Sequence, residues 1–119
     1  MNQIKIYEYK NCGTCKNALK FLDEHKIVYQ KLAIRETPPT VPELEQMLTY
    51  LGGDIRKLFN TSGLDYKALN MKNKITKLSQ KKLLELLASN GNLVKRPFVL
   101  TSNFGIVGFK VDEWAMVFR

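Results

Sequence analysis

Side chains that could bind a metal are scarce in this sequence, which contains two cysteines and one histidine among 119 residues. A structural zinc site needs about four ligands, and His25 is expected at the far end of the helix that starts beside the cysteines. We therefore predict no bound metal. Two cysteines are also too few for the disulfide framework of a small secreted domain. They form either a reactive pair or two unrelated core residues.

The sequence also lacks a long apolar run. No stretch approaches the ~18 residues that a membrane-spanning helix needs, and the opening residues MNQIKIYEYK lack the apolar core of a signal peptide. We therefore expect a cytoplasmic protein without membrane association. The length fits a single domain over residues 1–119, large enough to enclose one hydrophobic core. We expect this domain to be a monomer.

Positive charge predominates, with 19 lysines and arginines against 11 acidic residues and a net charge of +8. The cations are scattered, and the densest stretch, residues 72–82, has no interleaved aromatic side chains and no groove-binding motif. We therefore predict no direct nucleic-acid binding. Such a basic surface instead suits acidic protein partners or anionic substrates.

The first third of the chain has the pattern of a β-α-β unit. Residues 3–9 alternate like a strand, and a helix is predicted from Thr14 to about residue 26 because its apolar residues recur every three or four positions. Residues 27–34 are rich enough in β-branched and aromatic side chains for a second strand. This order is typical of two parallel strands joined by a crossover helix.

A helical block is predicted next, as an insertion over about residues 37–92. Its first helix begins at Thr40, which forms a capping box with Glu43. Residues 54–78 are predicted to form short helical pieces, and Ser79 is predicted to cap a further helix.

The last quarter returns to strands. Residues 98–100 and 104–107 are predicted to form a hairpin. A terminal amphipathic helix follows, with an apolar face formed by Val111, Trp114, Ala115 and Phe118. The whole order predicts an α/β fold in which helices pack on one mixed sheet.

Both cysteines lie in the stretch NCGTCK, at the predicted junction of strand and helix. The free N–H groups and partial positive charge of a helix N-terminus stabilise a thiolate, so we expect the pKa of Cys12 to lie below the ~8.5 of a free thiol. Cys15 heads the apolar stripe of the helix and should be more buried. Gly13 is expected to let the backbone turn tightly and a partner approach. This arrangement suits thiol–disulfide exchange, in which Cys12 attacks and Cys15 resolves the mixed disulfide.

A second motif, Arg96-Pro97, precedes the strand at 98–100, a place that suits proline because it cannot donate to a sheet. On its own this fragment is equally consistent with a simple turn carrying a solvated arginine. X–Pro bonds at such a place can be cis.

Taken together, the motifs YKNCGTCKNALKFL, KLFNTSGLDYKALN, KRPFVL and IVGFKVDEW give the chain a resemblance over its whole length to the arsenate reductase/Spx family of the thioredoxin-like superfamily. The resemblance implies a thioredoxin-like sheet with an inserted helical subdomain. It also implies that Pro97 is a cis proline facing the cysteine loop and that Arg96 points toward Cys12, so we predict Arg96 as a catalytic residue that stabilises the Cys12 thiolate. The substrate-binding residues implied in this way are Asn11, Gly13, Thr14, Arg96 and Pro97.

The sequence departs from the arsenate reductases of this family, which use one cysteine and three arginines around the oxyanion. Asn60 and Phe109 stand where two of these arginines would be, although Arg56 is close enough in sequence to replace one in part. Loss of two charge-assisted contacts weakens oxyanion binding. The second cysteine, Cys15, instead matches the family branch that has a CxxC motif.

Three functions are therefore predicted. The first is a thiol–disulfide redox protein that acts on oxidised protein thiols or a small anionic substrate, has no bound cofactor, and is reduced by glutathione, glutaredoxin or thioredoxin. The second is an Spx-like redox-sensing regulator that binds the RNA polymerase α subunit. The third is a glutaredoxin-dependent arsenate reductase.

Overall fold

A four-stranded mixed sheet lies at the centre of the computed structural model, which describes residues 3–118. The strand order is β2-β1-β3-β4; β1 runs parallel to β2 and antiparallel to β3, which pairs antiparallel with β4. The strands span Lys5–Glu8 (β1), Gln30–Ala33 (β2), Phe98–Leu100 (β3) and Gly105–Val107 (β4). The fold is the mixed α/β, thioredoxin-like fold predicted from the sequence.

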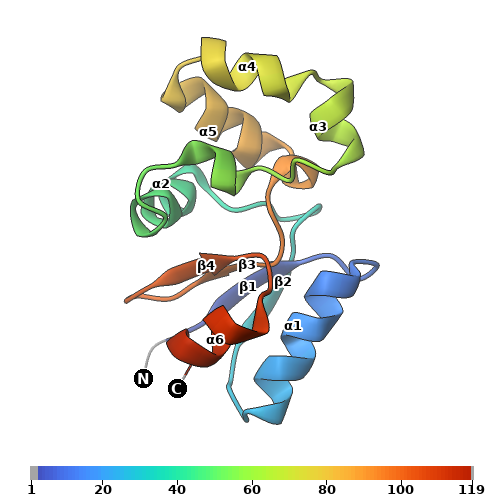
Figure 1. Ribbon diagram of the computed structural model, residues 1–119, viewed down its shortest axis with the longest axis vertical. Helices are drawn as coiled ribbons and strands as arrows, with labels where there is room; N and C mark the ends of the chain where they lie inside the picture. Colours follow the sequence, from blue (N-terminus) through green and yellow to red (C-terminus); the bar gives the residue numbers. More distant parts are fainter. Residues whose placement is uncertain (1–2, 119) are drawn as a thin grey trace.

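Helices cover both faces of this sheet (Figure 1). Helices α1 (Gly13–Glu24) and α6 (Val111–Val117) lie on one face, and their core cluster contains Ile6, Leu22 and Trp114. Helix α2 (Val41–Tyr50) and the helices that follow it cover the opposite face, where Tyr7 belongs to a second cluster. Because successive residues of a strand point to opposite faces, β1 contributes to both clusters.

The chain between β2 and β3 is helical. Thr40 caps α2 as predicted: its Oγ1 accepts from the Glu43 N–H at 3.3 Å, while Glu43 Oε1 accepts from the Thr40 N–H at 3.0 Å. Ser79 likewise caps α5, with Oγ 3.2 Å from the Lys82 N–H. The remaining elements are η1 (Ile55–Leu58), α3 (Leu64–Ala68), α4 (Met71–Lys77), α5 (Gln80–Ser89) and η2 (Gly91–Leu93).

Gly91 marks the place where this helical segment passes the end of β2. A Cβ atom on Gly91 would lie only 1.8 Å from the carbonyl oxygen of Ile34, so a larger residue would push the two segments apart. This close approach brings residues near 35 and residues near 92 to one side of the molecule.

Two sequence predictions need correction. The first two strands are shorter than predicted. The second begins late because Lys26 adopts a left-handed conformation (φ 56°) after α1, and the chain joins the sheet only at Gln30. In α6, Val111 is 56% exposed and Ala115 is exposed too, although both were predicted on the apolar face. This short helix packs chiefly through Trp114, whose Nε1 also donates to the Gly108 carbonyl at 3.0 Å.

Candidate functional site

Cys12 is the N-cap residue of α1. Its backbone is extended, and its Sγ accepts a hydrogen bond from the Cys15 N–H at 3.3 Å. Its own N–H donates to the Tyr9 carbonyl at 3.0 Å, which anchors the loop to the end of β1. The sulfur therefore occupies the place where a serine or aspartate oxygen usually caps a helix.

Cys15 lies one turn further along the same helix and is fully buried, whereas Cys12 is partly exposed; both thiols are free. Burial raises the pKa of the Cys15 thiol to about 12, and its hydrogen bond with Cys12 acts in the same direction. A backbone hydrogen bond with Tyr9 and the positive charge of Arg96 lower this pKa but do not compensate. The predicted difference in burial between the two thiols is confirmed.

The residues around the cysteines are open to solvent. Asn11, Gly13 and Thr14 are exposed, and Asn11 Nδ2 donates to the Tyr9 hydroxyl at 3.1 Å. A Cβ atom on Gly13 would meet nothing within 4 Å, and its backbone does not adopt a positive φ. Gly13 therefore begins α1 without the backbone conformation that only glycine adopts readily, and the expectation that it lets a partner approach stays a prediction. The substrate-binding roles of these three residues stay predictions.

The Arg96-Pro97 motif lies beside the cysteine loop. The peptide bond between the two residues is cis, as the family resemblance implied, and Pro97 is buried. Arg96 is half-buried, with its Cζ 5.1 Å from the centre of the Tyr9 ring. The positive charge of Arg96 also lowers the pKa of Cys15. Arg96 therefore interacts both with the dithiol and with the Tyr9 ring.

Arg35 is a site residue that the sequence reasoning missed. Its Cζ lies 3.8 Å from the centre of the Tyr9 ring. Arg35 and Arg96 both line a cavity of about 340 Å³, which also includes Asn60. The strand order could have revealed this neighbour, because Tyr9 and Arg35 follow parallel strands whose carboxyl ends share one edge of the sheet.

The other residues compared with the arginines of arsenate reductases are distributed differently. Asn60 lines the cavity, but Phe109 is partly buried and packs against the core cluster under α1 and α6, 4.9 Å from Trp114 between ring centres. Arg56 is exposed and is not among the residues that line this cavity. Within residues 3–118, therefore, Arg35 rather than Arg56 supplies the second positive charge.

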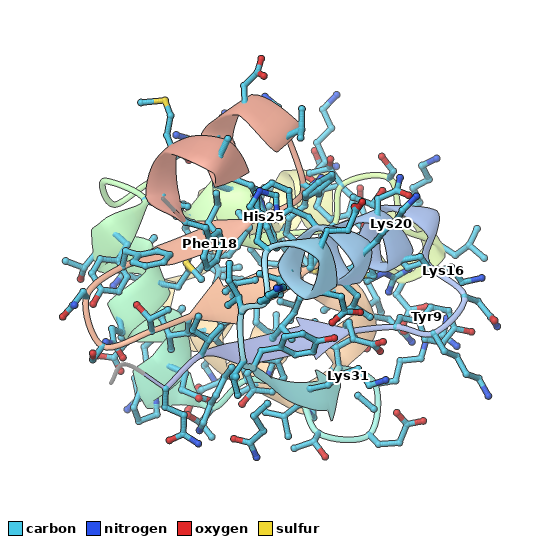
Figure 2. All side chains as sticks on the ribbon, turned by 90° about the horizontal axis from the view of Figure 1, so that it is seen from below. Tyr9, Lys16, Lys20, His25, Lys31 and Phe118 are labelled. Atoms are coloured by element: carbon cyan, nitrogen blue, oxygen red, sulfur yellow. The ribbon has the colours of Figure 1, made fainter. Side chains whose placement is uncertain are left out.

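His25 lies at the C-terminal end of α1, where its ring stacks on Phe21 at 4.0 Å. Figure 2 shows it toward Phe118, whereas Tyr9 and Lys16 lie together on another side of the molecule. Among residues 3–118, no group of three or more potential ligands could hold a metal ion. No helix in the described part of the chain is long and apolar enough to cross a bilayer.

A thioredoxin-like sheet with a partly exposed thiol at the start of α1 and a cis proline beside it defines a thioredoxin-fold protein with a dithiol. More narrowly, the chain belongs to the ArsC family, whose model matches residues 7–117.

Among curated proteins, the chain is 42% identical over 111 residues to the uncharacterized protein YusI of Bacillus subtilis, covering 93% of this chain and 94% of YusI. It is 28% identical over 110 residues to the global transcriptional regulator Spx of Enterococcus faecalis, covering 92% of this chain and 82% of Spx.

Two solved structures share this fold. An ArsC family related protein from Bacteroides fragilis is 40% identical, with a TM-score of 0.87 and coverage of 98% of this chain and 96% of the other. An arsenate reductase from Vibrio cholerae is 27% identical, with a TM-score of 0.76 and coverage of 87% of this chain and 86% of the reductase.

Proposed function

We propose that this protein is a thiol–disulfide oxidoreductase in which Cys12 is the nucleophile and Cys15 the resolving thiol. The observation that carries the proposal is the contrast between the two sulfurs. Cys12 is accessible at the N-cap of α1, while Cys15 is fully buried and burial raises its pKa. A buried thiol that stays protonated cannot compete for an incoming disulfide.

The reaction has two exchange steps. The Cys12 thiolate attacks one sulfur of a substrate disulfide, forming a Cys12–substrate mixed disulfide and releasing the other substrate half as a thiolate. Cys15 then loses its proton to solvent and attacks Cys12 Sγ, which releases the second half and leaves a Cys12–Cys15 disulfide. The dithiol thus supplies two electrons to reduce one substrate disulfide.

The second step is expected to be the slower one. Desolvation of Cys15 persists in the mixed disulfide, while the hydrogen bond and negative charge by which Cys12 raises the Cys15 pKa are lost. Arg96 then remains as the charge that favours the Cys15 thiolate. This gives Arg96 a positioning role in resolution beside its predicted contact with an anionic substrate.

We propose that glutathione, glutaredoxin or thioredoxin returns the pair to the dithiol state, without a bound cofactor. Oxidised protein thiols or a small anionic disulfide are the proposed partners, and the protein is expected to act as a monomer in the cytoplasm. A basic surface with a net charge of +8 favours such acidic partners.

Trapping of mixed disulfides tests this function. A Cys15→Ser variant expressed in cells should accumulate covalent partners, which reducing agent releases for identification by mass spectrometry. The matched Cys12→Ser variant should trap none, because it retains only the buried sulfur. Equal trapping by both variants, or by neither, would refute the assignment of Cys12 as nucleophile.

An Spx-like regulatory role is the second candidate, and the sequence similarity to Spx of Enterococcus faecalis favours it. In this case the CxxC pair acts as a sensor, and the folded domain binds the RNA polymerase α subunit. Pull-down with purified α subunit under reducing and oxidising conditions separates the two roles. A redox-dependent complex without disulfide reductase turnover would favour the regulator over the enzyme.

Arsenate reduction is the third candidate, and the similarity to the Vibrio cholerae arsenate reductase favours it. Two guanidinium groups, those of Arg35 and Arg96, line one cavity next to the Tyr9 ring and could bind an oxyanion. A steady-state assay with arsenate, glutathione and glutaredoxin tests this role. Turnover that survives Cys15→Ser but not Cys12→Ser would support single-cysteine arsenate chemistry.

A further inference from the structure

Two arginines meet at Tyr9 without a carboxylate to neutralise them. The Cζ atoms of Arg35 and Arg96 lie 3.8 and 5.1 Å from the centre of the Tyr9 ring. Among residues 3–118, no carboxylate oxygen lies within 4.0 Å of either guanidinium, since the one ion pair found there joins Lys5 to Glu43. Two neighbouring cations that share only an aromatic ring leave room for an anionic group of a ligand.

Two buried polar atoms of the same cavity lack a hydrogen-bond partner. One is Arg96 Nη1, a donor, and the other is Asn92 Oδ1, an acceptor. The orientation of the Asn92 amide is set by its Nδ2, which donates to Asp65 Oδ2 at 3.3 Å, so Oδ1 is the unpaired atom. Buried polar groups are nearly always paired, with protein or with ordered water, and a ligand that offers both an acceptor and a donor would pair these two.

Asp65 gives the cavity a negative end. Its Oδ2 accepts from Asn90 Nδ2 at 3.0 Å as well as from Asn92, whereas the described residues donate no hydrogen bond to its Oδ1. Asp65 lines the same cavity as the two arginines. The cavity therefore presents two cations and, separately, a carboxylate beside an unpaired amide oxygen.

From this geometry we infer that the cavity binds the zwitterionic α-amino-acid group of a low-molecular-weight disulfide substrate. Arg35 and Arg96 hold the ligand carboxylate, while Asp65 and Asn92 Oδ1 accept from its ammonium. Neither cysteine lines the cavity, so the amino-acid group must be several bonds from the reacting sulfur. The volume of about 340 Å³ is sufficient for such a group.

This inference rests on the proposed function, because the ligand is the disulfide that Cys12 attacks. The overall reaction converts one disulfide and the Cys12/Cys15 dithiol into two substrate thiols and the Cys12–Cys15 disulfide. The cavity adds no chemistry to these exchange steps. It selects which disulfide is presented to Cys12.

Three probes separate the two charges of the amino-acid group. The first is glutathione disulfide, whose γ-glutamyl part carries both. The second is its glutaryl analogue, which lacks the amino group, and the third is its 4-aminobutyryl analogue, which lacks the α-carboxylate. The measurement is the second-order rate at which each probe oxidises the reduced protein, followed by acid quench and mass spectrometry. Glutathione disulfide should react fastest.

Arg35→Ala should lower the rate ratio of glutathione disulfide to the 4-aminobutyryl analogue about fivefold, because the lost contact is to the carboxylate. Asp65→Asn should lower the ratio of glutathione disulfide to the glutaryl analogue, because the lost contact is to the ammonium. Arg56→Ala is the matched control: it removes the same charge from an exposed position outside the cavity and should leave both ratios within about twofold.

Equal rates for all three probes, or the same ratios in Arg35→Ala and Arg56→Ala, would overturn the inference while the dithiol remained active. A reduced protein that reacts with none of the probes, yet also traps no partner as Cys15→Ser, would instead refute the proposed function. Because Arg35 is exposed, its replacement should not impair folding, and a circular dichroism spectrum checks this.

Discussion

The separation of the two thiols leads to a quantitative prediction for their reactivity toward a small disulfide reagent. With a pKa of about 12, Cys15 is ionised only to ~10⁻⁴ at pH 8, whereas a free cysteine is ionised to about one quarter. The thiolate of Cys15 is therefore about 2,000-fold less populated at pH 8 than the thiolate of a free cysteine. A more basic thiolate is also a better nucleophile, by about 40-fold for this difference in pKa. The net effect is a rate about 50-fold below that of a free thiol, before steric exclusion is counted.

The assay uses 4,4′-dithiodipyridine and follows the released pyridinethione by stopped-flow absorbance. The Cys12→Ser variant reports Cys15 alone, and Cys15→Ser reports Cys12 alone. Burial, the largest cause of the raised Cys15 pKa, persists in the first variant even though the hydrogen bond and charge of Cys12 are gone. Losing the hydrogen bond and charge of Cys12 lowers the Cys15 pKa in this variant, so the effect of ionisation falls below 50-fold, while burial still keeps the reagent from the sulfur. We expect folded Cys12→Ser to react at least about tenfold more slowly than Cys15→Ser.

Unfolding supplies the control, since denaturant removes burial and should bring both variants to the rate of a free cysteine. If folded Cys12→Ser reacts within about fivefold of its unfolded form, Cys15 is neither buried nor protonated to the extent argued. The distinction between attacking and resolving thiols would then have no physical basis.

Three predictions concern stability, each measured by urea unfolding. Thr40→Ala removes the two hydrogen bonds of the Thr40 hydroxyl, accepted from the Glu43 N–H and donated to Glu43 Oε1, but keeps the bond from the backbone N–H of residue 40 to Glu43. It should destabilise the protein by about 1 kcal/mol, and Thr40→Ser should restore most of this. Burial alone would raise the pKa of Glu43, but hydrogen bonds, led by that from Tyr7, lower it overall. The Glu43 carboxylate therefore stabilises the folded protein above its unfolded pKa of about 4.3, and this stabilisation is lost as the pH falls below that value. The difference in unfolding free energy between wild type and Glu43→Gln should shrink as the pH falls from 6 to 3. A difference that stays constant over this range would contradict the argument. Trp114→Phe loses the hydrogen bond to Gly108 and leaves a void, and it should lower the free energy of unfolding by about 2 kcal/mol. A decrease of less than about 0.5 kcal/mol would show that Trp114 is not the main residue that packs α6 on the sheet.

The parts of the fold that could be predicted are those with a local pattern. Alternation, helical spacing and caps are properties of neighbouring residues, so the β-α-β unit and the capping box at Thr40 were predicted correctly. Strand ends depend on the partner strand, which is why residues 27–29 were wrongly assigned to β2. The exposed Val111 in α6 likewise shows that a short helix need not bury every apolar residue on its stripe.

The candidate site shows the same division. Cys12 and Cys15 could be found because they lie three residues apart, and the motif at Pro97 was found by resemblance. Arg35 could not be placed without the pairing register of β1 and β2. The contact of Asp65 with Asn92 joins residues 27 positions apart within the helical insertion, and no periodicity connects them.

Tyr9 explains why the dithiol and the cationic cavity belong to one site. Its carbonyl accepts from the Cys12 N–H, its ring lies against Arg35 and Arg96, and its hydroxyl accepts from Asn11. Backbone and side chain of a single residue thus connect the reacting sulfur with the charges proposed to select its substrate. Because Tyr9 directly follows β1, the central sheet holds this spacing rigidly. A substrate can therefore be selected by the distance between its sulfur and its charged group, not by charge alone.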